Sequence, residues 1–222
     1  MRIIKPYYEI ITPAEFTSEN VEAIYKKIEA AGRTCYKSED KIASGTAEKF
    51  VAAMVRNGHE AMLEHANMTI KFVVDRGVSH ELVRHRLCSF AQESTRYCNY
   101  SKDKFGTEIT FIKPCFYSEG SEMYETWKQA VATAEFRYFQ LLCIGSTPEQ
   151  ARSVLPNSLK TEIVMTANMR EWRNILKLRA AGERGAPHPQ MLEIMVPLLN
   201  ELREKLPALF TDITPMEINE KG

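Results

Sequence analysis

The sequence lacks a surplus of either charge: its 222 residues carry 29 Lys and Arg against 29 Asp and Glu. Proteins whose main work is to grip nucleic acid usually show a basic surplus, so this balance argues against that class. No apolar run approaches the length of a membrane span, and residues 1–5 lack the apolar core of a signal peptide. We therefore expect a soluble, cytoplasmic protein with no nucleic-acid or membrane partner.

Several site motifs are also missing. The five cysteines are odd in number and show no CxxC spacing, which indicates neither a disulfide framework nor a zinc knuckle. His59 and His65 stand six residues apart, out of phase on a helix, so we expect no shared metal. No GxGxxG follows a predicted strand, so a Rossmann dinucleotide domain is not implied.

What is present is a regular alternation of strand and helix patterns. Strands are predicted at 3–11, 68–74, 108–112 and 161–167, from β-branched and aromatic runs bounded by turn residues. Helices are predicted at 18–31, 46–57, 121–144, 168–179 and from His188 onward, the first one stopped by Gly32 before a polar loop at 33–38. No linker or repeat divides the chain, so we expect one α/β domain over residues 1–222.

The most informative stretch runs from Arg84 to Tyr97, which holds three arginines, one histidine and two serines. Arginine offers a planar fork of donors that matches phosphate oxygens, and the serines add neutral donors. We predict a short helix capped by Ser79 that ends in an anion-binding loop. A solvated basic turn is the simpler interpretation of such a stretch.

Three further segments carry polar residues in a suggestive order. His59 and Glu64 follow the second helix, Arg152 precedes Val-Leu-Pro, and the 168–179 helix carries Asn168, Arg170, Asn174 and Arg179. Each segment also has an ordinary interpretation, as structural histidines, a surface arginine or the wet face of a packed helix. Arginines in separated segments could converge on phosphate-bearing ligands.

Together these segments resemble the flavin-dependent thymidylate synthases. The match rests on Arg-His-Arg, seven residues and Ser over 84–94, extended by Arg96-Tyr97, on His59-Glu60 with Glu64-His65, on Arg152-x-Val-Leu-Pro, and on Asn-x-Arg-x3-Asn-x4-Arg over 168–179. The resemblance covers about residue 33 to the last helix. It implies an α+β-type domain with a mostly antiparallel sheet flanked by helices, and a non-Rossmann FAD site.

The resemblance also implies a reaction and an assembly. Such an enzyme makes dTMP from dUMP, with the one-carbon unit from methylenetetrahydrofolate and the hydride from NADPH through FAD. The family is a homotetramer whose sites are shared between subunits. Redox chemistry then lies in the cofactor, while the protein supplies orientation and charge.

Roles follow by matching position. The resemblance assigns FAD to His59, Glu64, Arg84, His85, Arg86, Gln92, Asn168, Arg170 and Asn174. It assigns dUMP to Glu81, Arg84, Gln92, Ser94, Arg96, Arg152 and Arg179. Arg179 is the expected catalytic residue at the uracil edge, and Ser94 is expected to position the substrate because no GxSxG elbow surrounds it.

Three positions depart from the family pattern, namely Glu81, Ala91 and Ala61. Glu81 stands where a glutamine is frequent, and an anion there would repel a nucleotide phosphate unless an arginine intervenes. Two other function classes stay open at this point. One is a nucleotide- or RNA-binding module that stacks a base on Tyr97; the other, a metal hydrolase on His59, His65 and His85, has the wrong spacing.

Overall fold

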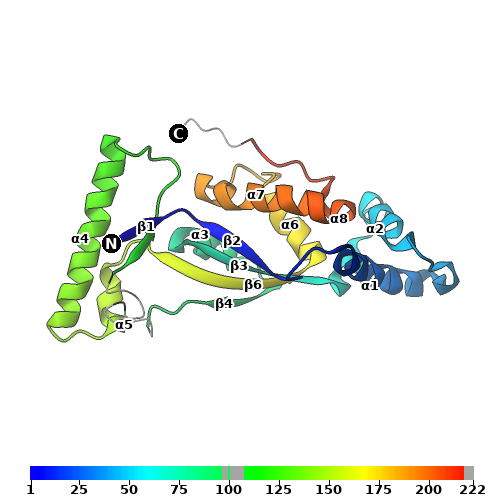
Figure 1. Cartoon of the computed structure of the whole chain (residues 1–222), viewed down its shortest axis with the longest axis horizontal. Helices are drawn as coiled ribbons and strands as arrows, with labels where there is room; N and C mark the ends of the chain where they lie inside the picture. Colours follow the sequence, from blue (N-terminus) through cyan, green and yellow to red (C-terminus); the bar gives the residue numbers. More distant parts are fainter. Residues whose placement is uncertain (97–99, 101–107, 218–222) are drawn as a thin grey trace.

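The computed structural model describes residues 1–96, Tyr100 and residues 108–217, so the predicted stacking ring of Tyr97 lies outside the described residues. Its centre is a four-stranded sheet in the order β2 (Tyr7–Thr12), β3 (Asn67–Asp75), β6 (Lys160–Asn168), β4 (Cys88–Gln92). All three neighbouring pairs run antiparallel. The mostly antiparallel, helix-flanked sheet is thereby confirmed (Figure 1).

A second, smaller pair of strands lies beside the N-terminus. Here β1 (Arg2–Ile4) pairs in parallel with β5 (Thr110–Ile112) and packs near α4 (Glu122–Cys143) and α5 (Pro148–Ala151). The predicted opening strand over 3–11 is therefore two strands with different partners. Pro6 explains the division, because a proline has no N–H to continue a ladder.

The main hydrophobic core lies between the four-stranded sheet and a layer of helices. These helices are α1 (Ser18–Tyr36), α2 (Thr46–Arg56), α6 (Met169–Arg179), α7 (Pro189–Lys205) and α8 (Pro207–Phe210). Short 3-10 turns lie between elements: η1 (Glu39–Lys41) joins α1 to α2, η2 (Glu60–His65) joins α2 to β3, and η4 (Arg152–Val154) lies between α5 and β6. Trp172 of α6 is fully buried and donates to the carbonyl oxygen of Met68 in β3. This contact anchors the predicted polar helix to the sheet.

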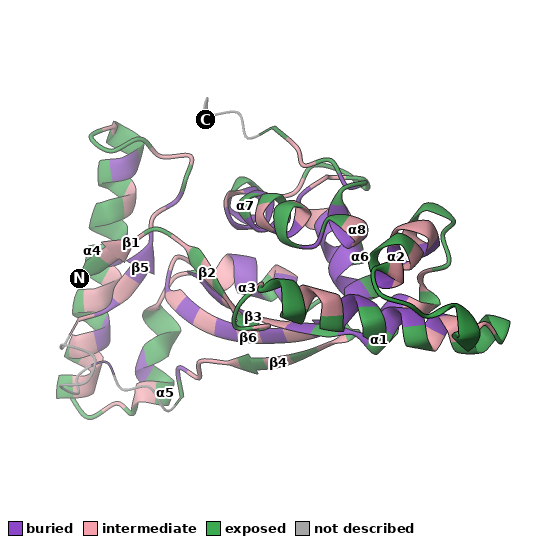
Figure 2. Cartoon of the chain, turned by 45° about the vertical axis from the view of Figure 1, so that its right-hand side comes forward, coloured by how far each residue is buried: buried purple, intermediate pink, exposed green. Residues whose placement is uncertain are grey.

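The opposite face of the sheet has no covering layer within residues 1–96 and 108–217. Along β6 buried and half-exposed residues alternate, as Figure 2 shows. The half-exposed set carries interleaved charges: Lys71 and Lys160 both pair with Glu162, at 2.7 Å each, and Lys160 also pairs with Glu93 at 3.0 Å. One side of the sheet is thus apolar and packed, and the other is open and ionic.

Two boundary predictions are wrong for a packing reason. The first helix continues through Gly32 to Tyr36, so residues 33–36 are helical rather than loop. A Cβ at Gly32 would lie 2.5 Å from the Phe50 ring, so this glycine lets α1 and α2 approach closely instead of ending the helix.

The basic stretch also folds differently from expectation. Asp75, not Ser79, caps α3 (Arg76–Leu82), since its carboxylate accepts the Val78 N–H at 2.7 Å. Ser79 lies inside that helix. Residues Cys88–Gln92 form the edge strand β4 rather than a loop, and Arg152 begins η4 just after α5 ends. None of the described helices is long and apolar enough to cross a membrane.

Candidate active site

Four side chains from three segments form a chain of contacts beside α6; we call Glu81, His85, Glu171 and Arg179 the Arg179 cluster. The Arg179 Nη1 donates to Glu81 Oε2 at 2.6 Å, and its Nε donates to His85 Nε2 at 3.2 Å. On the far side of the imidazole, His85 Nδ1 lies 3.6 Å from Glu171 Oε1. Arg179 keeps 14% of its side chain exposed, so its guanidinium is held by protein but still reaches solvent.

The hydrogen bond with Arg179 fixes the state of His85. A guanidinium can only donate, so Nε2 must be the bare nitrogen and the ring proton sits on Nδ1, facing Glu171. Burial, followed by the charges of Arg179 and Arg84, lowers the pKa of His85 to about 4. Burial also raises the pKa of Glu171. His85 is therefore a neutral acceptor at neutral pH.

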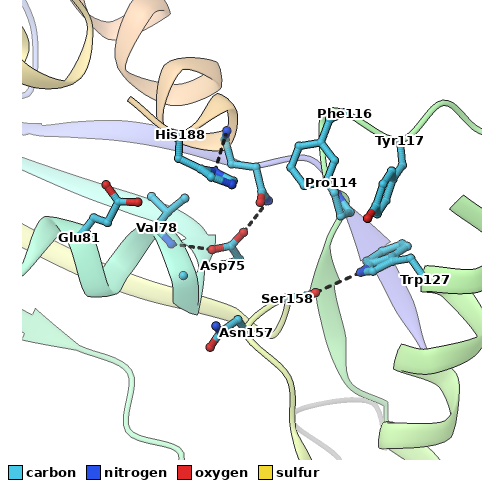
Figure 3. Close-up of a pocket in the computed structure, with 12 residues that line it drawn as sticks. Asp75, Val78, Glu81, Pro114, Phe116, Tyr117, Trp127, Asn157, Ser158 and His188 are labelled. Atoms are coloured by element: carbon cyan, nitrogen blue, oxygen red, sulfur yellow. Dashed lines mark hydrogen bonds between the residues drawn. The ribbon is translucent and has the colours of Figure 1, made fainter. Parts of the chain in front are cut away.

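Glu81, which departs from the family pattern, is paired with an arginine, Arg179, that can offset its negative charge. Its carboxylate is bound by Arg179 and is 31% exposed. It also borders a cavity of about 330 Å³ that we call the α3 pocket. Figure 3 shows the aromatic side of this pocket, where Phe116, Tyr117 and Trp127 face α3 and His188. Asp75 at its floor is already bound, because it accepts from Gln190 Nε2 at 2.5 Å.

The N-terminal half of α6 lines a second cavity of about 520 Å³, which we call the α6 pocket. Four predicted flavin residues line it: Glu64, Asn168, Arg170 and Asn174. Arg170 Nη1 bonds Glu64 Oε1 at 2.6 Å, with both side chains about half exposed. Asn168 caps the helix by accepting the Glu171 N–H at 2.8 Å, so the predicted cap is confirmed.

The other predicted flavin residues do not line this pocket. His59 Nδ1 is 3.1 Å from the hydroxyl of Tyr36 at the end of α1. Arg84 and Arg86 are exposed on the turn before β4, on either side of the buried His85. Gln92 is drawn away from α6, because its amide donates to Ser79 Oγ at 2.9 Å and to Thr161 Oγ1 at 3.2 Å.

The α6 pocket has the donor set that a dinucleotide flavin requires. Its lining includes the cations Arg170, Lys177 and Arg184, which suit a pyrophosphate, and Leu87 supplies apolar surface. Its size falls within the range of cofactor clefts, roughly 300–1,000 Å³. The residues present therefore fit FAD. Among the described residues, no group of three or more His, Cys, Asp or Glu could hold a metal ion.

The remaining dUMP residues gather beyond the other end of β4; we call Ser94, Thr95, Arg96, Glu149 and Arg152 the β4-exit cluster. Arg152 Nη1 donates to Thr95 Oγ1 at 2.9 Å, and Arg96 Nε bonds Glu149 Oε2 at 3.0 Å. Ser94 Oγ accepts the Arg96 N–H at 3.4 Å. Serine and arginine donors thus converge there, as an anion site needs.

One chain therefore divides the predicted dUMP residues between two places. Glu81 and His85, which hold Arg179, precede β4 in the chain, and Ser94 and Arg96 follow it. The extended chain from Cys88 to Ser94 spans about 20 Å. Sequence reasoning missed Glu171 and Arg173 altogether. The spacing Asn168-x-x-Glu171 is a helix-start signal that could have drawn attention to the acid, whereas nothing local marks Arg173.

Comparison with known proteins decides the family. Residues 19–208 match the model of the family described as thymidylate synthase complementing protein. A flavin-dependent thymidylate synthase of Corynebacterium aurimucosum is 35% identical over 203 residues, covering 83% of this chain and 78% of the relative. The chain belongs to this family. A flavin-dependent thymidylate synthase of Pyrococcus furiosus is 33% identical over 172 residues, covering 76% and 70%.

Solved structures agree on the fold. A UMP/dUMP methylase, PolB from Streptomyces cacaoi, crystallised with 5-Br dUMP, superposes with a TM-score of 0.73 and covers 95% of this chain and 96% of its own. The identity is 20%, so this likeness speaks for the architecture alone. The sheet and helix layer described above are thus those of the thymidylate synthase complementing family.

Proposed function

We propose that the protein makes dTMP from dUMP by reductive methylation, with FAD as cofactor. Methylenetetrahydrofolate would supply the carbon and NADPH the reducing equivalents. The single observation that carries the proposal is Arg179: a guanidinium held by Glu81 and His85, still partly exposed, between the α6 pocket and the α3 pocket. A guanidinium in this position is oriented by the protein and still has N–H groups that can bind a reacting group.

The chemistry of uracil explains why an arginine belongs there. Attack from C5 builds negative charge over the N3–C4–O4 part of the ring. A prepositioned guanidinium stabilises that charge more than it stabilises the neutral ring, which is the requirement for catalysis. The Glu81 carboxylate holds one edge of this guanidinium, so the N–H groups that remain can donate to the imide edge of uracil.

The phosphate of dUMP would bind at the β4-exit cluster, through Ser94, Arg96 and Arg152. The predicted dUMP residues fall into two clusters, and the family resemblance implies sites shared between subunits, so we propose that two copies of the chain complete each site. One copy would supply Glu81, Arg84 and Arg179, and the other Gln92, Ser94, Arg96 and Arg152. The open ionic sheet face, with its alternating Lys and Glu, supports a homotetramer, because such a face complements itself.

FAD would lie along α6, with Arg170, Asn168 and Asn174 on its polar groups and Arg84 and Arg86 approaching from the turn. Glu64 and His59 would close the side formed by η2, and Gln92 and His85 complete the set carried by the family resemblance. When bound, the flavin supplies the hydride. The protein's own part is to orient dUMP and to keep Arg179 aimed at the ring. We place the enzyme in the cytoplasm, as one domain over residues 1–222.

The test is a reaction with purified protein, FAD, dUMP, methylenetetrahydrofolate and NADPH, in which dTMP is measured by chromatography and flavin reduction by absorbance. We expect a yellow protein that forms dTMP only when all components are present. Folded protein that stays colourless with excess FAD, or that forms no dTMP, would overturn the proposal. Omitting only the folate should leave flavin reduction intact, which separates the two half-reactions.

A further inference from the structure

From the geometry of the Arg179 cluster we infer that His85 is a positioning residue: its neutral ring nitrogen fixes the plane of the Arg179 guanidinium toward the uracil ring. This inference rests on the proposed function. It assigns the imidazole a task for the nucleotide arginine, beside the place in the flavin set that the family resemblance gives it.

Two fixed points define the plane of a guanidinium. The Nε–H of Arg179 is held by His85 Nε2 at 3.2 Å, and one Nη1–H is held by Glu81 Oε2 at 2.6 Å. An arginine side chain otherwise loses rotamer entropy when a ligand orders it. Because both anchors are present before any ligand arrives, that cost does not fall on substrate binding. The N–H groups not used by these anchors can then donate to the ring.

The histidine itself is held rigidly. Only 6% of its side chain is exposed, and it lies on the short turn between α3 and β4. Glu171 faces Nδ1 at 3.6 Å and is in turn approached by the Asn174 amide at 3.3 Å. A carboxylate at this distance favours the proton on Nδ1, which leaves Nε2 bare for Arg179. The chain Asn174–Glu171–His85–Arg179 thus connects the α6 pocket with the nucleotide arginine.

A neutral anchor also preserves the charge that the reaction needs. Arg173, on the same helix, is bound by the carboxylates of Glu60 and Asp212 and by the carbonyl of Leu209. Those partners cancel its charge. Arg179 has one carboxylate and one imidazole, so a second anion does not oppose its attraction for an electron-rich ring.

Two amides of different length provide matched variants. In His85→Gln, the side-chain oxygen reaches the position of Nε2 and can accept from Arg179. In His85→Asn, the oxygen stops near the position of Nδ1 and cannot. We expect His85→Gln to keep kcat within about threefold of wild type, and His85→Asn to lose about 30-fold in kcat with KM for dUMP changed less than about threefold. His80→Asn, an exposed histidine on α3, is the control for an added asparagine.

A binding readout avoids turnover. The fluorine of 5-fluoro-dUMP acidifies its ring N3–H, so the ring becomes an anion over an accessible pH range near neutrality. In that range the pKa of about 4 keeps His85 neutral; the charged groups nearest to it are Arg179, Arg84, Glu81 and Glu171. Wild type and His85→Gln should bind this nucleotide about tenfold more tightly when the ring is ionised. His85→Asn should show no gain.

The outcomes separate cleanly. Equal behaviour of the two amides, in rate and in the gain with ring ionisation, would refute the positioning role, whether both are active or both inactive. If His85→Asn does not fold, as judged by near-UV circular dichroism, His85→Gln decides alone: loss of the binding gain in this folded variant overturns the inference. A wild type that binds neither nucleotide contradicts the proposed function instead.

Discussion

Arg173 and Arg179 lie on the same helix, six residues apart. They differ in how many N–H donors and how much charge their guanidinium groups keep available for a ligand. Arg173 is 1% exposed and is bound by Glu60 at 3.1 Å and by Asp212 at 2.7 Å. These bonds connect η2 and the C-terminal segment to α6. Arg179 is 14% exposed and has one carboxylate partner. The first arginine is saturated, and the second is oriented but unsaturated.

This difference shows how one helix separates stability from chemistry. A guanidinium with carboxylates on both edges has no donor for a ligand, and its removal leaves acids uncompensated. A guanidinium held by a neutral ring and one acid keeps donors and net charge for a substrate. The sequence of α6 does not show which arginine stabilises the fold and which can bind a substrate. The hydrogen-bond partners of each arginine do show it.

Arg179→Ala should give the largest effect. We expect dTMP formation to fall by about 10²–10³, because the charge that develops on the ring loses its partner. FAD binding and reduction by NADPH should persist, since the α6 pocket is untouched. Arg179→Lys should restore little, because an ammonium cannot be anchored at two edges. Near wild-type dTMP formation in the alanine variant, measured beside flavin reduction, would contradict the assigned role.

Arg173→Ala should act on the fold instead. The free energy of unfolding should fall by about 3 kcal/mol, since Glu60 and Asp212 lose their buried cation. The measurement is urea denaturation followed by circular dichroism. Arg170→Ala is the matched control on the same helix, because the exposed pair with Glu64 contributes at most about 1 kcal/mol. Similar stability losses in both variants would erase the distinction between saturated and open arginines.

Arg152 extends the comparison to the β4-exit cluster, where the arginine is exposed. Arg152→Ala should weaken dUMP binding by about 1.5–3 kcal/mol, the typical worth of a charge-assisted hydrogen bond. Calorimetry should show deoxyuridine, which lacks the phosphate, binding equally to the variant and to wild type. Unchanged dUMP affinity would remove Arg152 from the phosphate site.

Acid should disturb the Arg179 region before the Arg173 region. The pKa of His85 falls to about 4 in the fold, from about 6.5 in the unfolded chain. Between these two pH values the unfolded state therefore binds more protons than the folded state. The contribution of His85 to the free energy of unfolding has its full value above pH 6.5 and decreases as the pH falls to 4. The slope is at most about 1.4 kcal/mol per pH unit, and it should vanish in His85→Gln.

The Arg173 region responds at lower pH. Although burial works to raise it, the bond with Arg173 holds the pKa of Asp212 below its usual value. Its stabilisation is therefore present above about pH 3.9 and lost only as the pH falls through the depressed value. Denaturation curves collected from about pH 7 to 3 can resolve the two windows. A His85→Gln variant with the acid sensitivity of wild type would contradict this order.

Local signals predicted the elements that local chemistry decides. The Asn168 cap and the helix that ends at Arg179 are confirmed, because the cap and the apolar spacing lie within a dozen residues. The predicted helix end at Gly32 was wrong, because this glycine allows close contact with Phe50 on another helix. The strand β4 was hidden by the arginines and serines around it, although Cys88, Phe90 and Gln92 alternate as a half-buried strand should.

The arrangement of the candidate site could not be predicted from the sequence. The motif positions predict a set of site residues, which stays a prediction. The bonds that distinguish the arginines join residues 94 and 98 positions apart, His85 and Glu81 with Arg179. Such pairing depends on how α3 and α6 cross over the sheet, and no spacing along the chain records it. Glu171 escaped for the same reason, since its partner His85 belongs to another segment.

The C-terminal segment around Met216 is in contact with the end of α6, so truncating the gene before this segment should affect the site. The Met216 N–H donates to the carbonyl of Ala180, the residue after Arg179, at 2.8 Å. A side chain at Gly182, where φ is +66°, would collide with the Met216 sulfur. A stop codon at position 213 would spare all of residues 19–208, the part that matches the family, and every residue named in the site. We expect this truncated allele to fail in a complementation test, because the C-terminal end of α6, which carries Arg179, would lose the backbone hydrogen bond from Met216 to Ala180.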